Sequence, residues 1–344
     1  MWYSNPCKPK HKTTMKLNSF PRIVKFLLKD LPTNDHPVLN SRLFCSIWFA
    51  GILDKGINRL RDLFYQLNHA GTKVDLSTFS KANKTRDPQI FMRLYHKLLH
   101  YIEESHPEKK LVLCPFDATV IPLMSKLFWL QGYRQVKLIT TLNQDKKSTG
   151  YLIVNPRQEH EINFGEDIVK MLPENGVAVG DRGFCSHKVF DKFIENDALF
   201  IIRIKSNWKW DENYHITTGR GKVRVVCFGN VQQKVDYYLA TNIPEEVMSN
   251  EEIGEAYRQR WAIEVLWKFL KMHLKLDKMM SKNLNGITIQ IYVILIVYLI
   301  LQLLKVPRIY GSKLVDKFRY IQILIRQEWN FVHWLNQVVP RLNM

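Results

Sequence analysis

The stretch VAVGDRGFCSHKVFDKFIENDALFIIRI, residues 177–204, decides the fold class. It opens with a short apolar run, has the composition and spacing of a helix over 186–197, and ends in a second apolar run over 198–204. Short apolar runs bounded by turn residues predict buried strands, and apolar residues three and four apart predict a helix. The stretch therefore predicts a strand–helix–strand unit, which is typical of a sheet that carries helices on its faces.

Segments on both sides of this unit extend the predicted sheet. Upstream, three apolar runs predict strands, at 111–116, 119–123 and 135–142. The segment 165–173 predicts a helix. Downstream, the runs KVRVVCFG and KVDYYLATN predict two strands joined near Gly229-Asn230. We interpret residues 205–253, which break the strand–helix rhythm, as a β-rich insertion. The prediction is an α/β fold with a mixed sheet.

The front of the chain, residues 17–105, reads as a series of short helices. Apolar spacing predicts helices in 22–31, 41–53 and 56–71, where Gly71 is a plausible stop. Asp75 or Ser77 could cap a further short helix, and Asp87 followed by Pro88 predicts the start of another over 88–105. Short basic helices suit DNA recognition, but a plain bundle with a solvated basic face fits the pattern equally well.

The predicted organisation has three parts. Residues 1–108 form a helical DNA-binding domain, residues 109–304 form the catalytic sheet domain with its insertion at about 205–253, and residues 305–344 form a helical C-terminal segment. The chain of 344 residues is long enough for such a division.

The charge favours a polyanionic partner. Lys and Arg number 50 against 32 Asp and Glu, giving a formal charge of +18, and the hydrophobic content of 46% is too high for a disordered chain. The excess is strongest over residues 1–110 but extends along the whole chain. Nucleic acid is the first candidate partner and an anionic membrane surface the second, and an ordinary small-metabolite enzyme is disfavoured.

Cysteine usage and the N-terminus indicate a cytoplasmic protein. The five cysteines are an odd number with no close pairs, at 7, 45, 114, 185 and 227. A disulfide framework or a zinc knuckle would need pairs at short spacing, so reduced thiols are expected. The opening MWYSNPCKPKHKTTMK has no apolar core, and no signal peptide is predicted.

One segment, ITIQIYVILIVYLILQLL at 287–304, is long and apolar enough to approach a membrane span. Five polar or amphipathic residues interrupt it: Thr288, Gln290, Tyr292, Tyr298 and Gln302. A single span would leave the basic remainder unexplained. We expect a buried core helix, with a membrane helix as the alternative.

The segment YRQRWAIEVLWKFLK, residues 257–271, is the most informative for chemistry. If it forms one helix, Tyr257, Arg260, Glu264 and Lys271 fall within a stripe about 60° wide, opposite the apolar residues. Most such stripes are merely solvated. A carboxylate beside two cations and a tyrosine, however, also suits a metal ligand next to phosphate contacts.

Two isolated aspartates strengthen this interpretation. Asp117 and Asp181 each follow an apolar strand run, and strand-end carboxylates on neighbouring strands lie close together because strands are about 4.8 Å apart. With Glu264 as a third carboxylate, they could hold two Mg²⁺ ions about 3.5–4 Å apart and support in-line phosphoryl transfer. Taken alone, an aspartate at a strand end is more often a cap or turn residue.

These residues resemble a known family. The spacing of Tyr257, Arg260, Glu264 and Lys271 matches the Y-R-E-K signature of the insertion-sequence-four (IS-four) family of DDE transposases. FDAT at 116–119 and GDRGF at 180–184 resemble its first and second aspartate blocks. The first block often reads Asp-Gly-Thr or Asp-Ser-Thr in relatives, and here it reads Asp-Ala-Thr, which keeps a small residue. The similarity covers about 110–300.

The resemblance implies a ribonuclease-H-like catalytic domain with the acidic triad Asp117, Asp181 and Glu264. It implies cleavage at terminal inverted repeats, hairpin formation by the freed 3′ hydroxyl, and joining to target DNA. The implied cofactor is two Mg²⁺ ions, for which Mn²⁺ substitutes. The implied partners are double-stranded DNA, as transposon ends and target, and a second copy of the chain in a synaptic homodimer, with no membrane.

Further DNA contacts follow from the same resemblance. Tyr257 and Arg260 would contact phosphates near the cleaved end, Lys271 the 5′ phosphate side, and Arg182 also approaches DNA. Relatives stack a flipped base on a tryptophan of the insertion, for which Trp208 and Trp210 are candidates, although a tryptophan there is more often core.

Three weaker expectations come from position alone. Arg203 and Lys205 leave the strand 198–204 beside the presumed site, where they touch phosphate or form an exposed basic edge. His187 reads as a helix-start residue. Trp261 and Trp267 are expected to pack.

The leading prediction is a DNA transposase that uses metal-assisted phosphoryl transfer. The alternatives are a metal-dependent nuclease of the same fold that cuts without joining, a catalytically silent DNA-binding protein derived from a transposase, and a membrane protein.

Overall fold

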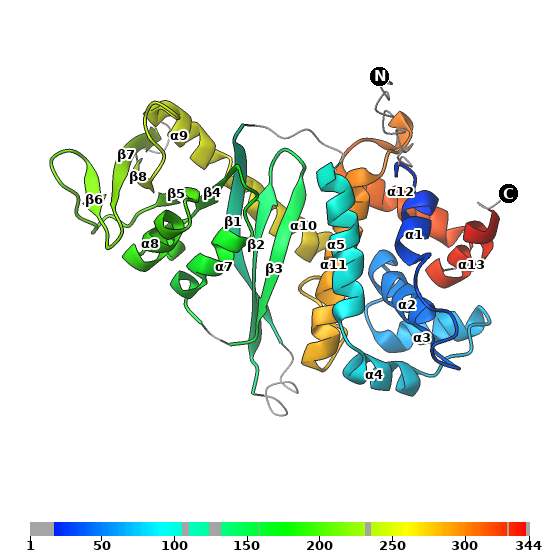
Figure 1. Cartoon of the computed structure of the whole chain (residues 1–344). Helices are drawn as coiled ribbons and strands as arrows, with labels where there is room; N and C mark the ends of the chain where they lie inside the picture. The colour runs from blue at the N-terminus through cyan, green and yellow to red at the C-terminus, as the bar shows by residue number, and fades with distance from the viewer. Residues whose placement is uncertain are drawn as a thin grey trace, which may run out of the picture.

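The computed structural model describes residues 17–104, 110–123, 132–157, 159–230, 235–328 and 330–341. The N-terminal segment 1–16, on which the signal-peptide prediction and Cys7 fall, lies outside these ranges. A mixed sheet with helices on its faces lies beside a helical body built from both ends of the chain (Figure 1).

The described strands form one eight-stranded sheet in the order β3-β2-β1-β4-β5-β8-β7-β6. β1, β4 and β5 are parallel, and the remaining pairs are antiparallel. The strand bounds are β1 Val112–Pro122, β2 Gln135–Asn143, β3 Ser148–Asn155, β4 Gly176–Gly180, β5 Leu199–Arg203, β6 His215–Thr217, β7 Lys222–Asn230 and β8 Val235–Thr241. The predicted strand–helix–strand unit is confirmed as β4, α8 (His187–Glu195) and β5.

Two strand predictions upstream of that unit are wrong. The runs 111–116 and 119–123 are one continuous strand, β1, so that Asp117 lies within the strand and not at its end. β3 was not predicted, because its sequence STGYLIVN opens with small polar residues and its side chains alternate only weakly in burial. The polar residues at the start of β3 have hydrogen-bonding partners, since the Thr149 hydroxyl lies within hydrogen-bonding distance of a buried tyrosine hydroxyl in the helical body.

The β-rich insertion is confirmed as strands, and it continues the main sheet. β8 pairs with β5, with Ile201 opposite Thr241, and β7 and β6 follow outward to the edge. The two predicted strands joined near Gly229-Asn230 correspond to β7 and β8.

Alternation along β4 assigns the two faces of the sheet. Ala178 points to a cluster with Phe190 and Phe193 of α8, which α7 (Gly165–Lys170) and the short η1 (Glu161–Phe164) also cover. Val177 and Val179 point to the opposite face, which α9 (Asn250–Arg258) covers. Further along this second face, α10 (Trp261–Leu274) packs on β1 and β2.

The helical body combines the front of the chain with its end. The five helices predicted over 17–105 are confirmed as α1 Phe20–Leu28, α2 Ser41–Leu53, α3 Leu60–His69, α4 Leu76–Thr85 and α5 Gln89–Glu104. Gly71 has φ +86°, as a helix stop requires. They share one apolar core with α10 and with the last helices, α11 Leu284–Leu303, α12 Leu314–Arg326 and α13 Phe331–Arg341.

The apolar segment 287–304 lies in the centre of this body as α11, between α2, α4, α5, α10 and α12. By length and composition alone α11 could cross a membrane, but 83% of its most apolar window is buried inside the protein. Its interrupting polar residue Gln290 is fully buried and satisfied, since its amide donates to the Lys278 carbonyl at 3.0 Å and accepts from the Met280 N–H at 2.8 Å. In this structure α11 is a core helix.

Candidate active site

The two predicted aspartates lie on neighbouring parallel strands. β1 and β4 pair from Val112 opposite Gly176 to Pro115 opposite Val179, and the same register continued by two residues sets Asp117 opposite Asp181. Asp181 comes directly after β4, where its Oδ1 accepts a hydrogen bond from the Gly183 N–H at 2.8 Å. Both side chains are partly buried.

A close approach of the two strands fixes this arrangement. A Cβ atom on Gly180 would lie 2.3 Å from the ring of Phe116, which is too close for any side chain. Phe116 therefore occupies the space that a residue other than glycine would need, and its ring packs on Phe184 with centroids 4.7 Å apart. Because side chains alternate along a strand, Asp117 points to the opposite face, toward α10.

The third predicted carboxylate, Glu264, stands in the first turn of α10. Its carboxylate accepts from the guanidinium of Arg260, which also lies over the Tyr257 ring at 5.7 Å from the centroid. Both partners are shielded, with side-chain exposures of 16% for Arg260 and 33% for Glu264.

The prediction that 257–271 forms one helix is wrong. α9 ends at Arg258 and α10 begins at Trp261, and the link is tightened by 3₁₀-type bonds, from the Arg260 N–H to the Tyr257 carbonyl at 3.0 Å and from the Ile263 N–H to the Arg260 carbonyl at 3.2 Å. Gln259 and Arg260 keep right-handed helical dihedral angles, so the break is local; α9 packs on β4 and β7, and α10 packs on β1 and β2. Tyr257, Arg260 and Glu264 still converge across the break.

The electrostatics show that these groups act on one another. The pKa of Asp117 is raised to about 7, chiefly by burial and also by the charges of Asp181 and Glu264, against the lowering effects of a backbone hydrogen bond and of Arg260. Burial also raises the pKa of Tyr257, whereas Arg260 and Arg203 lower it. Asp117, Asp181, Glu264, Tyr257, Arg260 and Arg203 therefore form one electrostatic group.

The donor set of this group suits a hard divalent cation. It offers carboxylate oxygens from three separate elements, and Asp117 carries a charge that its surroundings leave incompletely balanced. Within the described ranges no three His, Cys, Asp or Glu side chains stand close enough together to hold an ion as they are positioned. The Glu264 carboxylate is paired with the Arg260 guanidinium in this structure. The residues fit a divalent metal once that carboxylate is released.

The remaining predicted contacts are not members of this electrostatic group. Lys271 stands in the last turn of α10 and Arg182 is exposed in η2 (Arg182–Phe184) next to Asp181. Trp208 stacks on His187 with ring centroids 4.6 Å apart, and Trp210 packs on Tyr238 at 4.9 Å. Both tryptophans pack against the apolar cluster on the α8 face, away from the face of Asp117.

Three smaller predictions have clear outcomes. His187 is confirmed as the first residue of α8, after the N-cap Ser186. Trp267 is confirmed as core, with 4% exposure. The prediction that Trp261 packs is wrong, because its side chain is 62% exposed at the start of α10, where the break between helices leaves it outside the interface.

Sequence reasoning missed one neighbour of the site, Glu161, whereas it had predicted Arg203 beside the site. Glu161 of η1 lies against the Asp181 turn, where its Oε2 would be 2.4 Å from a Cβ on Gly183, and it pairs with the buried Lys137 at 3.4 Å. Arg203 stacks on Tyr237 at 4.1 Å, which orients its guanidinium. The Asp-Arg-Gly spacing signals the turn. No sequence pattern signals Glu161, which follows neither a strand nor a helix.

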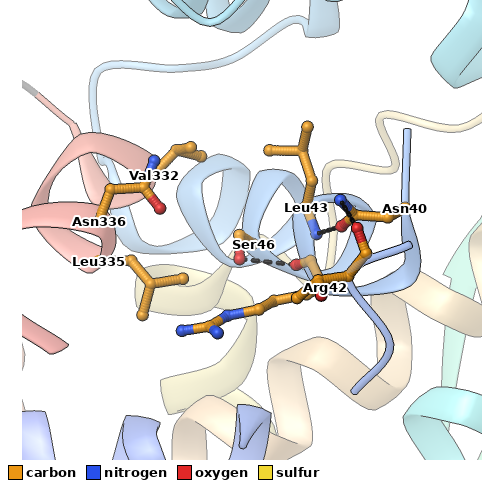
Figure 2. Close-up of a pocket in the computed structure, with 8 residues that line it drawn as sticks. Asn40, Arg42, Leu43, Ser46, Val332, Leu335 and Asn336 are labelled. Carbon is orange, nitrogen blue, oxygen red and sulfur yellow. Dashed lines mark hydrogen bonds between the residues drawn. The ribbon is translucent and has the colours of Figure 1, made fainter. Parts of the chain in front are cut away.

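A cavity in the helical body is separate from this group. It has a volume of about 330 Å³ and lies between α2 and α13 (Figure 2). Its walls come from residues such as Asn40, Arg42, Ser46, Leu335 and Asn336, and it contains none of the three carboxylates. The chemistry is concentrated at the junction of β1, β4 and α10.

Comparison with known proteins identifies the family to which the chain belongs. The family model described as a transposase DDE domain matches residues 109–300, which include all three carboxylates. A putative transposase for insertion sequence element IS4SA from Synechocystis sp. is 39% identical over 339 residues, covering 94% of this chain and 100% of the relative. The putative transposase y4zB from Sinorhizobium fredii is 22% identical over 248 residues, covering 64% of this chain and 69% of the relative.

A probable transposase for insertion sequence element IS5377 from Geobacillus stearothermophilus is 25% identical over 148 residues, covering 37% of this chain and 38% of the relative. The matched domain and the carboxylate group together define the class as DDE transposases, which in general depend on divalent metal. The chain belongs to the insertion-sequence-four (IS-four) family of these transposases.

Proposed function

We propose that this chain is the transposase of a bacterial insertion sequence, which binds the element's terminal inverted repeats, cleaves the DNA and joins it to a target. The observation that carries the proposal is the convergence of Asp117, Asp181 and Glu264 from two parallel strands and a helix, with Arg260 beside them. The strand order 3-2-1-4-5, with an antiparallel meander leading into parallel strands, supports a ribonuclease-H-like catalytic domain.

The three carboxylates are the proposed ligands of two Mg²⁺ ions, which Mn²⁺ replaces. Bound metal supplies activation of a water or a 3′ hydroxyl and stabilisation of the leaving oxygen in the in-line displacement. In the proposed sequence a water first releases a 3′ hydroxyl at the element end. That hydroxyl attacks the opposite strand to form a hairpin, a water reopens the hairpin, and the 3′ end then attacks the target.

The surrounding cations are the proposed phosphate contacts. Arg260 is shielded and oriented by Glu264 and Tyr257, so it can present a planar donor set to phosphate once the carboxylate turns to metal. Arg203 lies within reach of the same group. Tyr257, Lys271 and Arg182 complete the proposed contacts with the DNA end, and either Trp208 or Trp210 would have to leave its present partner to stack a flipped base.

The proposed assembly is a synaptic homodimer on two ends of double-stranded DNA, in the cytoplasm and without a membrane anchor. The charge of +18 supports it, because a transposase must contact element ends and target DNA together.

The test is cleavage and strand transfer with labelled DNA that spans the end of the element. Glu264→Gln keeps the size of the side chain and can still accept from Arg260, but it removes the charge that holds metal. We expect end binding within about threefold of wild type and a loss of metal-dependent cleavage of at least about 100-fold. Persistent cleavage in this variant would show that the proposed triad is wrong.

The same assay separates the alternatives. A nuclease would cleave the end but fail to join a pre-cleaved 3′ end to target DNA. A catalytically silent DNA-binding protein would bind the end without cleaving it in Mg²⁺ or Mn²⁺.

A further inference from the structure

The exposed face of α10 has an unusual composition for a helix that packs into the core. Trp261, Val265 and Met272 are 62%, 50% and 62% exposed, and Lys268 is exposed between them. Their spacing of four, three and four residues sets them in one row along the helix. This row lies beside Glu264 and Lys271 on the same helix, so it continues directly from the candidate active site.

Two hydrogen-bonded contacts bring other elements to the far end of this row. Lys275, just past α10, donates from its buried Nζ to the carbonyls of Gly51 at 2.6 Å and Ile57 at 2.6 Å, at the end of α2. Gln322 of α12 donates to the Leu53 carbonyl at 3.1 Å. The ends of α10 and α2 and the middle of α12 therefore meet at one place.

This meeting point concentrates positive charge. The charges of Lys55, after α2, and Arg319, on α12, both act on His273 of α10. Two acidic groups lie nearby: Asp54, which accepts from the Gly56 N–H at 2.8 Å, and Asp316, which lies 3.8 Å from the largely exposed Arg319. Lys55 and Lys268 have no carboxylate partner among the residues that the structure describes. A cluster of positive charges of this kind favours the binding of a polyanion.

We propose that this face, made by Trp261, Val265, Lys268, Met272, Lys55 and Arg319, is a tract that holds the backbone of duplex DNA leading away from the bond being cleaved. The inference rests on the proposed function. From Glu264 to the end of α10 the helix rises about 15 Å, which corresponds to roughly four to five base pairs. The cations Lys55 and Arg319 then lie one half-turn of duplex from the cleaved bond, and the apolar row contacts sugars between them.

Duplex DNA is favoured over a second copy of the chain for two reasons. Lys268 lies within the row and Lys55 and Arg319 act on His273 at its far end, so a second copy with the same charge would be repelled. The row is also continuous with a site whose proposed substrate is DNA.

The test measures how binding depends on salt. The probe is a fluorescein-labelled 30-base-pair duplex of mixed sequence, titrated with wild type and with Lys55→Ala, Lys268→Ala and Arg319→Ala between about 50 and 200 mM salt. We expect each variant to reduce the slope of log affinity against log salt by about 1. The matched control is Lys188→Ala, which removes an exposed lysine from α8 on the other face of the sheet and should leave the slope unchanged.

Failure of this inference differs from failure of the proposed function. If wild type cleaves its element ends while all three variants keep the wild-type slope, the tract is disproved and the transposase proposal stands. If wild type neither binds nor cleaves element ends, the proposed function fails and the tract fails with it. If the three variants alter the monomer–dimer equilibrium in sedimentation and leave the slope unchanged, the face is a contact between copies and the DNA tract is disproved.

Discussion

Asp117 is expected to lower the stability of the metal-free protein at the position where it is proposed to bind metal. It is a partly buried acid on the inward side of a strand, with two further carboxylates acting on it and one guanidinium to offset them. Such an arrangement is unfavourable in the absence of bound cation. The sequence gives the identity of the three acids and their order, but it cannot give their mutual effect, which depends on the register of β1 against β4.

This imbalance predicts that Asp117→Asn stabilises the metal-free protein. The pKa of Asp117 is raised to about 7, so between pH 4 and 7 the folded state binds a proton that the unfolded state releases, and stability falls as pH rises through that window. At pH 8 we expect the free energy of unfolding to rise by about 2 kcal/mol, and the gain to vanish near pH 4. Urea denaturation in EDTA across this pH range measures it.

The matched control is Glu212→Gln, an exposed acid in the insertion, which should change stability by less than about 0.5 kcal/mol. An Asp117→Asn variant that is no more stable than wild type at pH 8 would show that the three carboxylates do not act on one another as the structure indicates.

In contrast to Asp117→Asn, a substitution at Gly180 is expected to lower the free energy of unfolding. Gly180→Ala would force its new methyl group into the ring of Phe116 and push β4 away from β1. We expect a loss of about 1–3 kcal/mol in unfolding free energy, with metal-dependent cleavage reduced because the two aspartates separate. The double variant Gly180→Ala with Phe116→Leu should recover part of the stability. No recovery would mean that the ring contact is not the cause.

At the scale of elements, the helices were the most predictable part. Apolar spacing and cap residues over 20–104 predict five helices, because these helices bury apolar residues in one shared core. The helix break at Gln259 and Arg260 was not predictable, since no glycine or proline marks it in the sequence. Residues 111–123 were not predicted as one strand, because an aspartate such as Asp117 usually marks the end of a strand. In the structure Asp117 lies inside β1 although it is partly buried there.

The link between α5 and β3 predicts a specific loss of stability. The buried hydroxyl of Tyr95 donates to the Thr149 carbonyl at 2.9 Å and lies 2.8 Å from the Thr149 hydroxyl. Tyr95→Phe removes this hydroxyl and leaves strand groups without a partner, so we expect a loss of about 1–3 kcal/mol in unfolding free energy. Tyr65→Phe, an exposed tyrosine on α3, is the control and should be neutral in urea denaturation. Equal stability of the two variants would contradict a role for the Tyr95 hydroxyl in joining helix and sheet.

At the scale of the molecule, both ends of the chain surround α11. The predicted boundary at 108 and 109 separates helices from strands in sequence, yet helices α1 to α5 share a core with α11, α12 and α13. Linear order could not reveal this, because contacts between residues some two hundred positions apart leave no local pattern. Charge and length predict a large protein with a polyanionic partner, and the packing explains why an apolar segment lies within it.

This packing predicts that the sheet domain does not stand alone. A fragment of residues 109–304 keeps every strand but exposes α11, whose surface is apolar on all sides. We expect the fragment to aggregate or to bind a hydrophobic dye at the temperature where the full chain is folded. Sedimentation and dye fluorescence, with the full chain as control, measure this. A monomeric fragment that unfolds cooperatively would support an independent catalytic domain bounded at 109 and 304.

The shared core around α11 also sets the timing of folding during synthesis. Helices α1 to α5 leave the ribosome first, but α11 follows only after the whole sheet has been translated, an interval of roughly 10–40 seconds at typical elongation rates. Throughout that interval the apolar surfaces of α2, α4 and α5 that pack on α11 lack their final partner. The nascent chain therefore depends on chaperones or on provisional contacts, and slow translation of the strands lengthens the period in which it is vulnerable to proteolysis.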